Sequence, residues 1–207
     1  MGFYQRRIFP WLNDRLNRDP ELEKLRTEAM APARGRVVEI GFGTGANLTH
    51  YPATVASVTA IEPNQGMRDR GAAKLGQATV PVELVAGTAE HILFPDRSFD
   101  TAVSTLTLCT VADPAQVLAE LSRVLRDDGR LIVLEHGLSE DAGVARWQNR
   151  LDRLQSIVAC GCHLNRPIVD LVEHSGFRFE ALRKFYAPGI PRTHGWIAMG
   201  AAAKTPG

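Results

Sequence analysis

A glycine loop that follows an apolar run with an acidic residue near its end carries most of the chemical information in this sequence. Residues 37–45 read VVEIGFGTG, with Glu39 two positions before Gly41. Glycine adopts positive φ freely and lets the backbone approach a ligand that a side chain would block. The pattern predicts a buried strand that ends on a loop cradling a nucleotide-like cofactor.

Two cofactor classes are compatible with this loop. Gly41, Gly43 and Ala46 fit the GxGxxA form of the dinucleotide fingerprint, which leaves NAD possible. Glu62 ends the next apolar run, where a carboxylate commonly accepts the ribose hydroxyls. S-Adenosylmethionine is favoured by Glu39, because an acidic group at that point can face the positively charged amino end of a methionine moiety, which NAD lacks.

The elements that must position these residues are strands and helices alternating from residue 36 onward, which predicts a mostly parallel, doubly wound sheet. The expected strands are 36–40, 57–61, 82–85, 99–104, 130–134, 177–185 and 193–201. The expected helices are 65–75, 114–125, 144–158 and 167–174, with a further helix beginning at 46–51 and a turn at 127–129. The last two strands have no expected helix between them and should pair in an antiparallel manner. Such a pair, after five parallel strands, also favours a methyltransferase over a dehydrogenase.

Composition is that of a single globular domain. The chain has 207 residues, 44% hydrophobic and 23% charged, with a net charge of +1. Nothing in the charge pattern predicts a nucleic-acid partner, and no apolar run approaches the roughly 18 residues of a membrane span. We expect a cytoplasmic protein that is a monomer or homodimer, with at most peripheral membrane contact. Residues 1–33 are expected to form a helical extension that packs on the domain or edges a lid, and residues 140–166 an inserted cap.

Three segments resemble class I S-adenosylmethionine-dependent methyltransferases of the methyltransferase type 11 group: residues 39–45, 61–64 and 94–100. More narrowly, residues 105–111, 135–136 and 161–166 are similar to the methyltransferase-like group that includes alkyl-thiol methyltransferases. The resemblance implies a Rossmann-like, seven-stranded α/β sheet, mostly parallel with one antiparallel strand near the C-terminus and helices on both faces. It implies S-adenosyl-L-methionine as cofactor. The implied cofactor-binding residues are Glu39, Gly41, Gly43, Gly45, Asn47, Glu62, Pro63, Met67, Thr88, Ala89, Glu90, Thr105 and Leu106.

Two histidines are candidate general bases for an acceptor that must lose a proton. His136 ends the fifth expected strand, and His163 lies in the inserted segment. Either could deprotonate a thiol or hydroxyl, although a histidine in such a position is more often a structural residue that only donates and accepts hydrogen bonds. Methyl transfer itself mainly requires alignment and desolvation of the two reactants.

The cysteines do not identify the methyl acceptor. Cys160, Cys162 and His163 suggest a metal or arsenic site, but structural zinc normally needs four ligands, so we assign no metal. We expect these residues to line an acceptor pocket beneath the helix 144–158. The predicted function is methylation of a small lipophilic acceptor, with a thiol as first choice. The alternatives are O- or N-methylation of a quinone, phenol or phospholipid head group, or a non-catalytic module that binds the cofactor.

Overall fold

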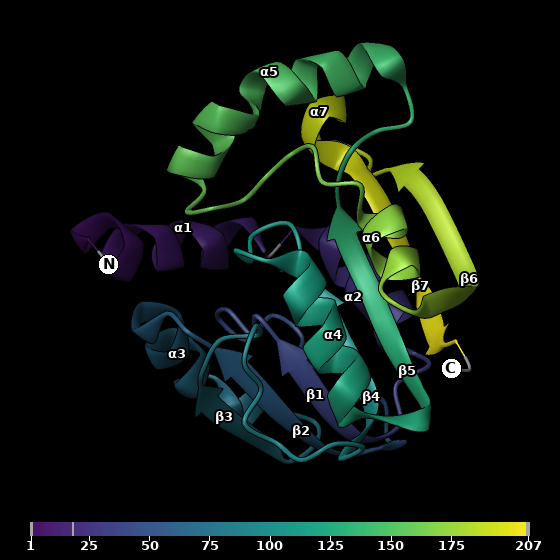
Figure 1. Cartoon of the computed structure of the whole chain (residues 1–207). Coiled ribbons are helices and arrows are strands. Elements are labelled where there is room, and N and C mark those ends of the chain that lie inside the picture. The colour runs from purple at the N-terminus through teal and green to yellow at the C-terminus, as the bar shows by residue number, and fades with distance from the viewer. Residues whose placement is uncertain (1, 18, 206–207) are drawn as a thin grey trace.

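The computed structural model describes residues 2–17 and 19–205 and contains one seven-stranded sheet in the order β3-β2-β1-β4-β5-β7-β6 (Figure 1). Strand β7 runs antiparallel to its neighbours β5 and β6, and all other neighbouring strands are parallel. This confirms the predicted fold class. The strands are β1 (Gly35–Ile40), β2 (Val55–Glu62), β3 (Val82–Ala86), β4 (Phe99–Thr105), β5 (Leu125–His136), β6 (Phe177–Tyr186) and β7 (Trp196–Lys204).

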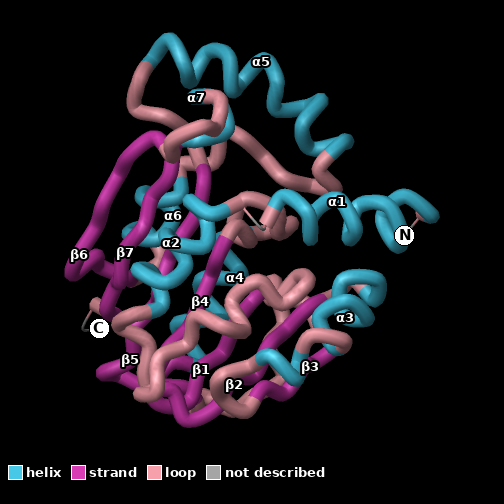
Figure 2. The backbone as a smooth tube through the Cα atoms, turned by 180° about the vertical axis from the view of Figure 1, so that it is seen from behind, coloured by secondary structure: helices cyan, strands magenta, loops and turns pink. Residues whose placement is uncertain are grey.

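Helices cover both faces of the sheet, as Figures 1 and 2 show from opposite sides. Successive residues of a strand point to opposite faces. Val38 therefore packs in the core beneath α4 and α6, whereas Val37 packs in the core beneath α2. The helices are α1 (Phe9–Leu16), α2 (Pro20–Met30), α3 (Gln65–Ala72), α4 (Pro114–Val124), α5 (Ala142–Val158), α6 (Ile168–His174) and α7 (Arg192–Gly195), with a π-helical turn at Tyr4–Ile8 and a 3-10 turn at Leu75–Gln77.

The N-terminal extension contains the helices α1 and α2, and α2 begins at Pro20. Asp19 caps α2 by accepting hydrogen bonds from the backbone N–H groups of Glu21 at 2.9 Å and Leu22 at 3.4 Å. Proline suits the first position of a helix because its missing N–H would have no partner there. Helix α1 crosses the carboxyl ends of the parallel strands, and α5 lies above it (Figure 1). Within residues 2–17 and 19–205, no helix is both long and apolar enough to cross a membrane.

Three local predictions were wrong. Residues 46–50 form turns in place of a helix start, because backbone bonds such as that from His50 to Asn47 span three residues. Strand β5 begins at Leu125 and continues through the predicted turn at 127–129, with a register shift opposite β4. The one-turn helix α7 lies between β6 and β7, although the two strands still pair in the predicted antiparallel manner.

Candidate active site

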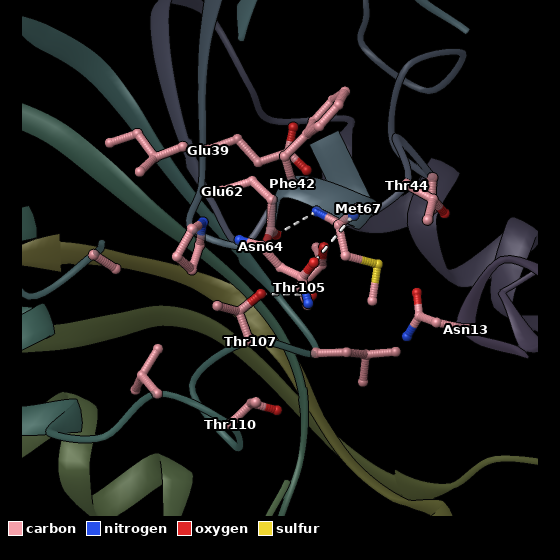
Figure 3. A pocket seen from close by; sticks show the side chains of 18 of the residues that line it. Asn13, Glu39, Phe42, Thr44, Glu62, Asn64, Met67, Thr105, Thr107 and Thr110 are labelled. Atoms are coloured by element: carbon pink, nitrogen blue, oxygen red, sulfur yellow. Dashed lines mark hydrogen bonds between the residues drawn. The ribbon is translucent and has the colours of Figure 1, made fainter. Parts of the chain in front are cut away.

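A cavity of about 660 Å³ opens at the carboxyl ends of β1, β2 and β4, within the usual size range of small-molecule sites (Figure 3). Every residue predicted to bind the cofactor lines this cavity, except Gly45. Figure 3 shows Glu39, Glu62 and Asn64 grouped together, with Thr107 and Thr110 toward another end. The N-terminal extension adds residues that were not predicted, namely Gln5, Phe9, Asn13, Asn17 and Arg26.

The glycine loop is shaped by two different constraints. Gly41 has φ +66°, and a Cβ atom there would lie 2.2 Å from Thr107 Oγ1, so both conformation and space require glycine. Gly43 has φ +58°, but a Cβ atom there would find its nearest neighbour at 3.8 Å, because this residue borders the open cavity. The loop therefore packs tightly against the β4 end at Gly41 and leaves free space at Gly43.

Glu39 is buried at the end of β1, and both of its carboxylate oxygens accept hydrogen bonds. Asn47 Nδ2 donates to Oε1 at 2.7 Å, and the Tyr51 hydroxyl donates to Oε2 at 2.8 Å. Burial raises the pKa of Glu39 to about 7, against the opposing effects of these two bonds and of nearby Arg26. A cationic ligand group in the cavity would therefore favour the ionised form of this carboxylate.

Glu62 joins the glycine loop to the end of β2. Its Oε2 accepts from the Gly43 N–H and its Oε1 from the Asn64 N–H, both at 2.8 Å. Burial raises the pKa of Glu62, while the two backbone bonds act in the opposite direction. Each carboxylate oxygen has more than one acceptor lone pair, so both retain capacity for a further donor.

Arg26 of α2 is a buried cation that sequence reasoning missed. It is 3% exposed, and it donates from Nη1 to Asn47 Oδ1 at 2.9 Å and from Nη2 to Asn17 Oδ1 at 2.5 Å. Its Nε has no partner among the described residues. A signal was present, because Arg26 lies four residues after Leu22 on the apolar face of the helix. A charged residue on such a face is a candidate for a buried polar role.

The other end of the cavity is lined by Leu106, the loop 110–112 and Cys160. Leu106 and Cys160 both have φ +52°, which is strained for residues other than glycine. The loop after β4 is held by Glu135, which is fully buried and accepts from the N–H groups of Thr107 at 2.8 Å and Leu108 at 2.9 Å. Glu135 lies outside the cavity lining but fixes the backbone that forms it.

Neither histidine predicted as a general base lines the cavity. His136 Nε2 lies 3.0 Å from Cys162 Sγ, and His163 Nδ1 lies 2.8 Å from Asp152 Oδ2. Their catalytic roles therefore remain predictions from the sequence.

Comparison with known proteins identifies the family. A family model described as a methyltransferase domain matches residues 38–133. A phosphatidylethanolamine N-methyltransferase of Cereibacter sphaeroides is 34% identical over 139 residues, covering 66% of this chain and 68% of the relative. The chain belongs to the class I S-adenosylmethionine-dependent methyltransferases.

A second relative and a solved structure are also similar to this methyltransferase. Thiol S-methyltransferase TMT1B of Rattus norvegicus is 34% identical over 146 residues, which are 68% of this chain and 59% of that protein. The present methyltransferase thus spans less than two thirds of the length of that relative. A SAM-dependent methyltransferase from Thermotoga maritima shares the fold with a TM-score of 0.70 at 23% identity, covering 98% of each chain.

Proposed function

We propose that this methyltransferase transfers the methyl group of S-adenosylmethionine to a small lipophilic thiol. The observation that carries the proposal is the cavity lining, which contains no histidine, lysine or tyrosine among the described residues. A thiol with a pKa of about 8.5 is partly ionised near neutral pH, whereas phenols and alkyl amines, with pKa values of about 10, require a base. A thiol acceptor therefore suits a cavity that offers few groups able to remove a proton.

The carboxylates that do line the cavity are already engaged with donors of the protein. Glu39 and Glu62 accept the bonds described above, and Glu90 Oε1 accepts from the Ala112 N–H at 3.0 Å. Their arrangement supports binding of a cationic cofactor more than proton transfer to or from an acceptor. The relation to the thiol S-methyltransferase agrees with this choice.

The chain's own residues fit the cofactor in charge and space. The bound cofactor supplies an electrophilic methyl group on a sulfonium centre. Glu62 would accept the ribose hydroxyls, Glu39 with Asn47 would face the amino group of the methionine part, and Arg26 would face its carboxylate through the unpartnered Nε. Because Gly43 has no side chain, the glycine loop leaves space for the cofactor beside these residues. The adenine would lie among the remaining predicted residues, namely Pro63, Met67, Thr88, Ala89 and Glu90.

We further propose that residues 140–166 form the cap that selects the acceptor. Cys160 lines the cavity, and the Tyr4 hydroxyl donates to the Val158 carbonyl at 2.8 Å, which joins the end of α5 to the N-terminal extension. The last turns of α5 also expose Leu154, Ile157 and Val158, and these apolar side chains would favour the approach of an apolar acceptor.

A panel of acceptors tests the proposed function with the full chain. Aryl and alkyl thiols, phenols, a reduced quinone and phosphatidylethanolamine vesicles are each incubated with S-adenosylmethionine, and S-adenosylhomocysteine release is measured. We expect turnover on thiols, with a rate that rises with pH as the acceptor thiol ionises. Turnover on the phospholipid or quinone without any on thiols would overturn the thiol assignment. Calorimetric binding of S-adenosylhomocysteine without turnover on any acceptor would identify a non-catalytic module.

A further inference from the structure

A cluster of two cysteines and one histidine lies outside the cavity and has no part in the function proposed above. Cys109 follows β4, His136 ends β5, and Cys162 follows α5. The two Sγ atoms and His136 Nε2 all lie within 4.8 Å of one another. We propose that these three side chains bind one thiophilic divalent cation of the Zn²⁺ class.

The spacing of the cluster is close to that of a tetrahedral site. The two Sγ atoms are 3.8 Å apart. Tetrahedral geometry with Zn–S bonds of about 2.3 Å places two sulfur ligands about 3.8 Å apart. His136 Nε2 lies 3.0 Å from Cys162 Sγ, whereas the same geometry requires about 3.5 Å between nitrogen and sulfur, with Zn–N bonds of about 2.0 Å. A retreat of the imidazole ring by about half an ångström would therefore bring the spacing of His136 and Cys162 to the tetrahedral value.

The residue types match the preference of a borderline-soft cation for thiolate and imidazole ligands. Cys109 is buried, so a cation there would be shielded from most of the solvent. A cysteine thiol ordinarily titrates at a pKa of about 8.5, so both thiols bind protons at neutral pH when no cation is present. Because metals bind thiolates, cation binding at neutral pH should release protons.

The cluster joins three distant parts of the chain. The backbone N–H of His163 donates to the Cys109 carbonyl at 2.8 Å, so the segment after α5 already contacts the loop after β4. A bound cation would fix that contact and hold the cap segment on the sheet. Thr110 lines the cavity, and its Oγ1 lies 3.4 Å from Cys109 Sγ. Cys109 therefore lies beside the end of the cavity that is lined by Leu106, the loop 110–112 and Cys160.

The set of ligands differs from the one that the sequence suggested. Cys160 and His163 were considered together with Cys162, but Cys160 lines the cavity and His163 pairs with Asp152. Cys109 and His136 form the ligand set with Cys162 instead, because the fold brings the ends of β4 and β5 next to the loop after α5. His136 Nδ1 has no partner among the described residues, although metal-bound histidines usually donate from the second nitrogen. We therefore expect weaker binding than in a closed four-ligand zinc site.

Titration of the full chain with Cd²⁺ tests the proposal, after removal of metal and reduction with a phosphine. Thiolate-to-metal absorption should rise to a plateau at one ion per chain, with release of about two protons. Cys109→Ser, Cys162→Ser and His136→Asn should each weaken binding at least tenfold. Cys160→Ser is the matched control and should bind as the wild type does. Absence of stoichiometric binding by the wild type, or unchanged binding by the Cys109→Ser/Cys162→Ser double variant, would overturn the proposal.

A labelling experiment on the wild-type chain avoids any variant that fails to fold. Alkylation rates are measured at each cysteine by mass spectrometry, with and without Zn²⁺. Zn²⁺ should slow alkylation of Cys162 at least tenfold and leave Cys160 unchanged. Equal rates at Cys162 in both conditions, or equal protection of Cys160, would contradict the three-residue site. Neither measurement requires an acceptor, so its outcome is independent of the proposed methyl transfer.

Discussion

The two ends of the cavity are built in different ways. At the end formed by β1 and β2, Glu39 and Glu62 each accept two hydrogen bonds from residues nearby in the sequence or in the glycine loop. At the other end, Leu106 and Cys160 hold left-handed backbone conformations and come from segments far apart in the chain. The first end is a polar network in which both carboxylates are hydrogen-bonded and Arg26 Nε has no partner among the described residues. The second end contains two strained backbone positions. This division would suit a family whose members share the methyl donor S-adenosylmethionine and differ in the methyl acceptor.

The largest effect is expected where the glycine loop meets the end of β4. Gly41→Ala combines positive φ with an overlap against Thr107, which together should lower the free energy of unfolding by about 4 kcal/mol. Urea denaturation measures the change. Gly76→Ala is the matched control, since a Cβ atom there meets nothing within 4 Å. Equal stability of the two variants would show that the loop is less tightly packed than its geometry indicates.

The pH dependence of stability should reveal the cost of burying Glu39. Its pKa of about 7 in the folded state lies above the ordinary 4.5, so the folded protein binds this proton more tightly than the unfolded chain. The resulting stabilisation is complete below about pH 4.5 and is lost as pH rises through about 7, a change of about 3 kcal/mol.

Glu39→Gln cannot titrate, so it should remove that contribution. Urea unfolding at several pH values compares the two proteins. Glu62 and Glu135 also have raised pKa values, so the slope should become smaller without disappearing. An unchanged slope would mean that Glu39 is better solvated than its position suggests.

Cofactor affinity should separate the roles of Glu62 and Arg26 at the end of the cavity formed by β1 and β2. Glu62→Ala should weaken binding of both S-adenosylhomocysteine and 5′-methylthioadenosine by about 2 kcal/mol, roughly 30-fold, because both ligands carry the ribose. Arg26→Gln should weaken only S-adenosylhomocysteine, since methylthioadenosine lacks the amino-acid part. Calorimetry with both ligands measures the difference. Unchanged affinities for Glu62→Ala would refute the ribose assignment.

The smallest expected effect tests the backbone strain at Cys160, at the other end of the cavity. Asparagine adopts the left-handed conformation more readily than cysteine, so Cys160→Asn should stabilise the protein by about 1 kcal/mol and raise Tm by about 2–4 °C. Ala159→Asn is the control, because that residue has φ −98° and gains nothing from the exchange. A lower Tm for Cys160→Asn would indicate that the cysteine side chain contributes more than its backbone costs.

Local sequence patterns predicted much of the cavity end that β1 and β2 form. A strand, an acidic residue and a glycine loop are adjacent in the chain, and the end of a strand fixes where the following side chain lies. For this reason Glu39, Gly41, Gly43 and Glu62 were predicted together and lie around one cavity. The helix expected at 46–51 was wrong, because Asn47 and Tyr51 instead direct their side chains to Glu39 from a series of turns.

The sequence by itself determined the sheet, its single antiparallel strand and the identity of the family, because these depend on periodicity and on motifs confined to a few residues. Tertiary structure alone decided that Arg26 enters the cavity from the N-terminal extension and that Glu135 fixes the loop after β4. It also decided that Cys162 faces Cys109 and His136 in place of its sequence neighbours. Each of these contacts joins segments far apart along the chain, and no local pattern identifies the partners. Only packing of the helices and the cap segment on the finished sheet could therefore bring them together.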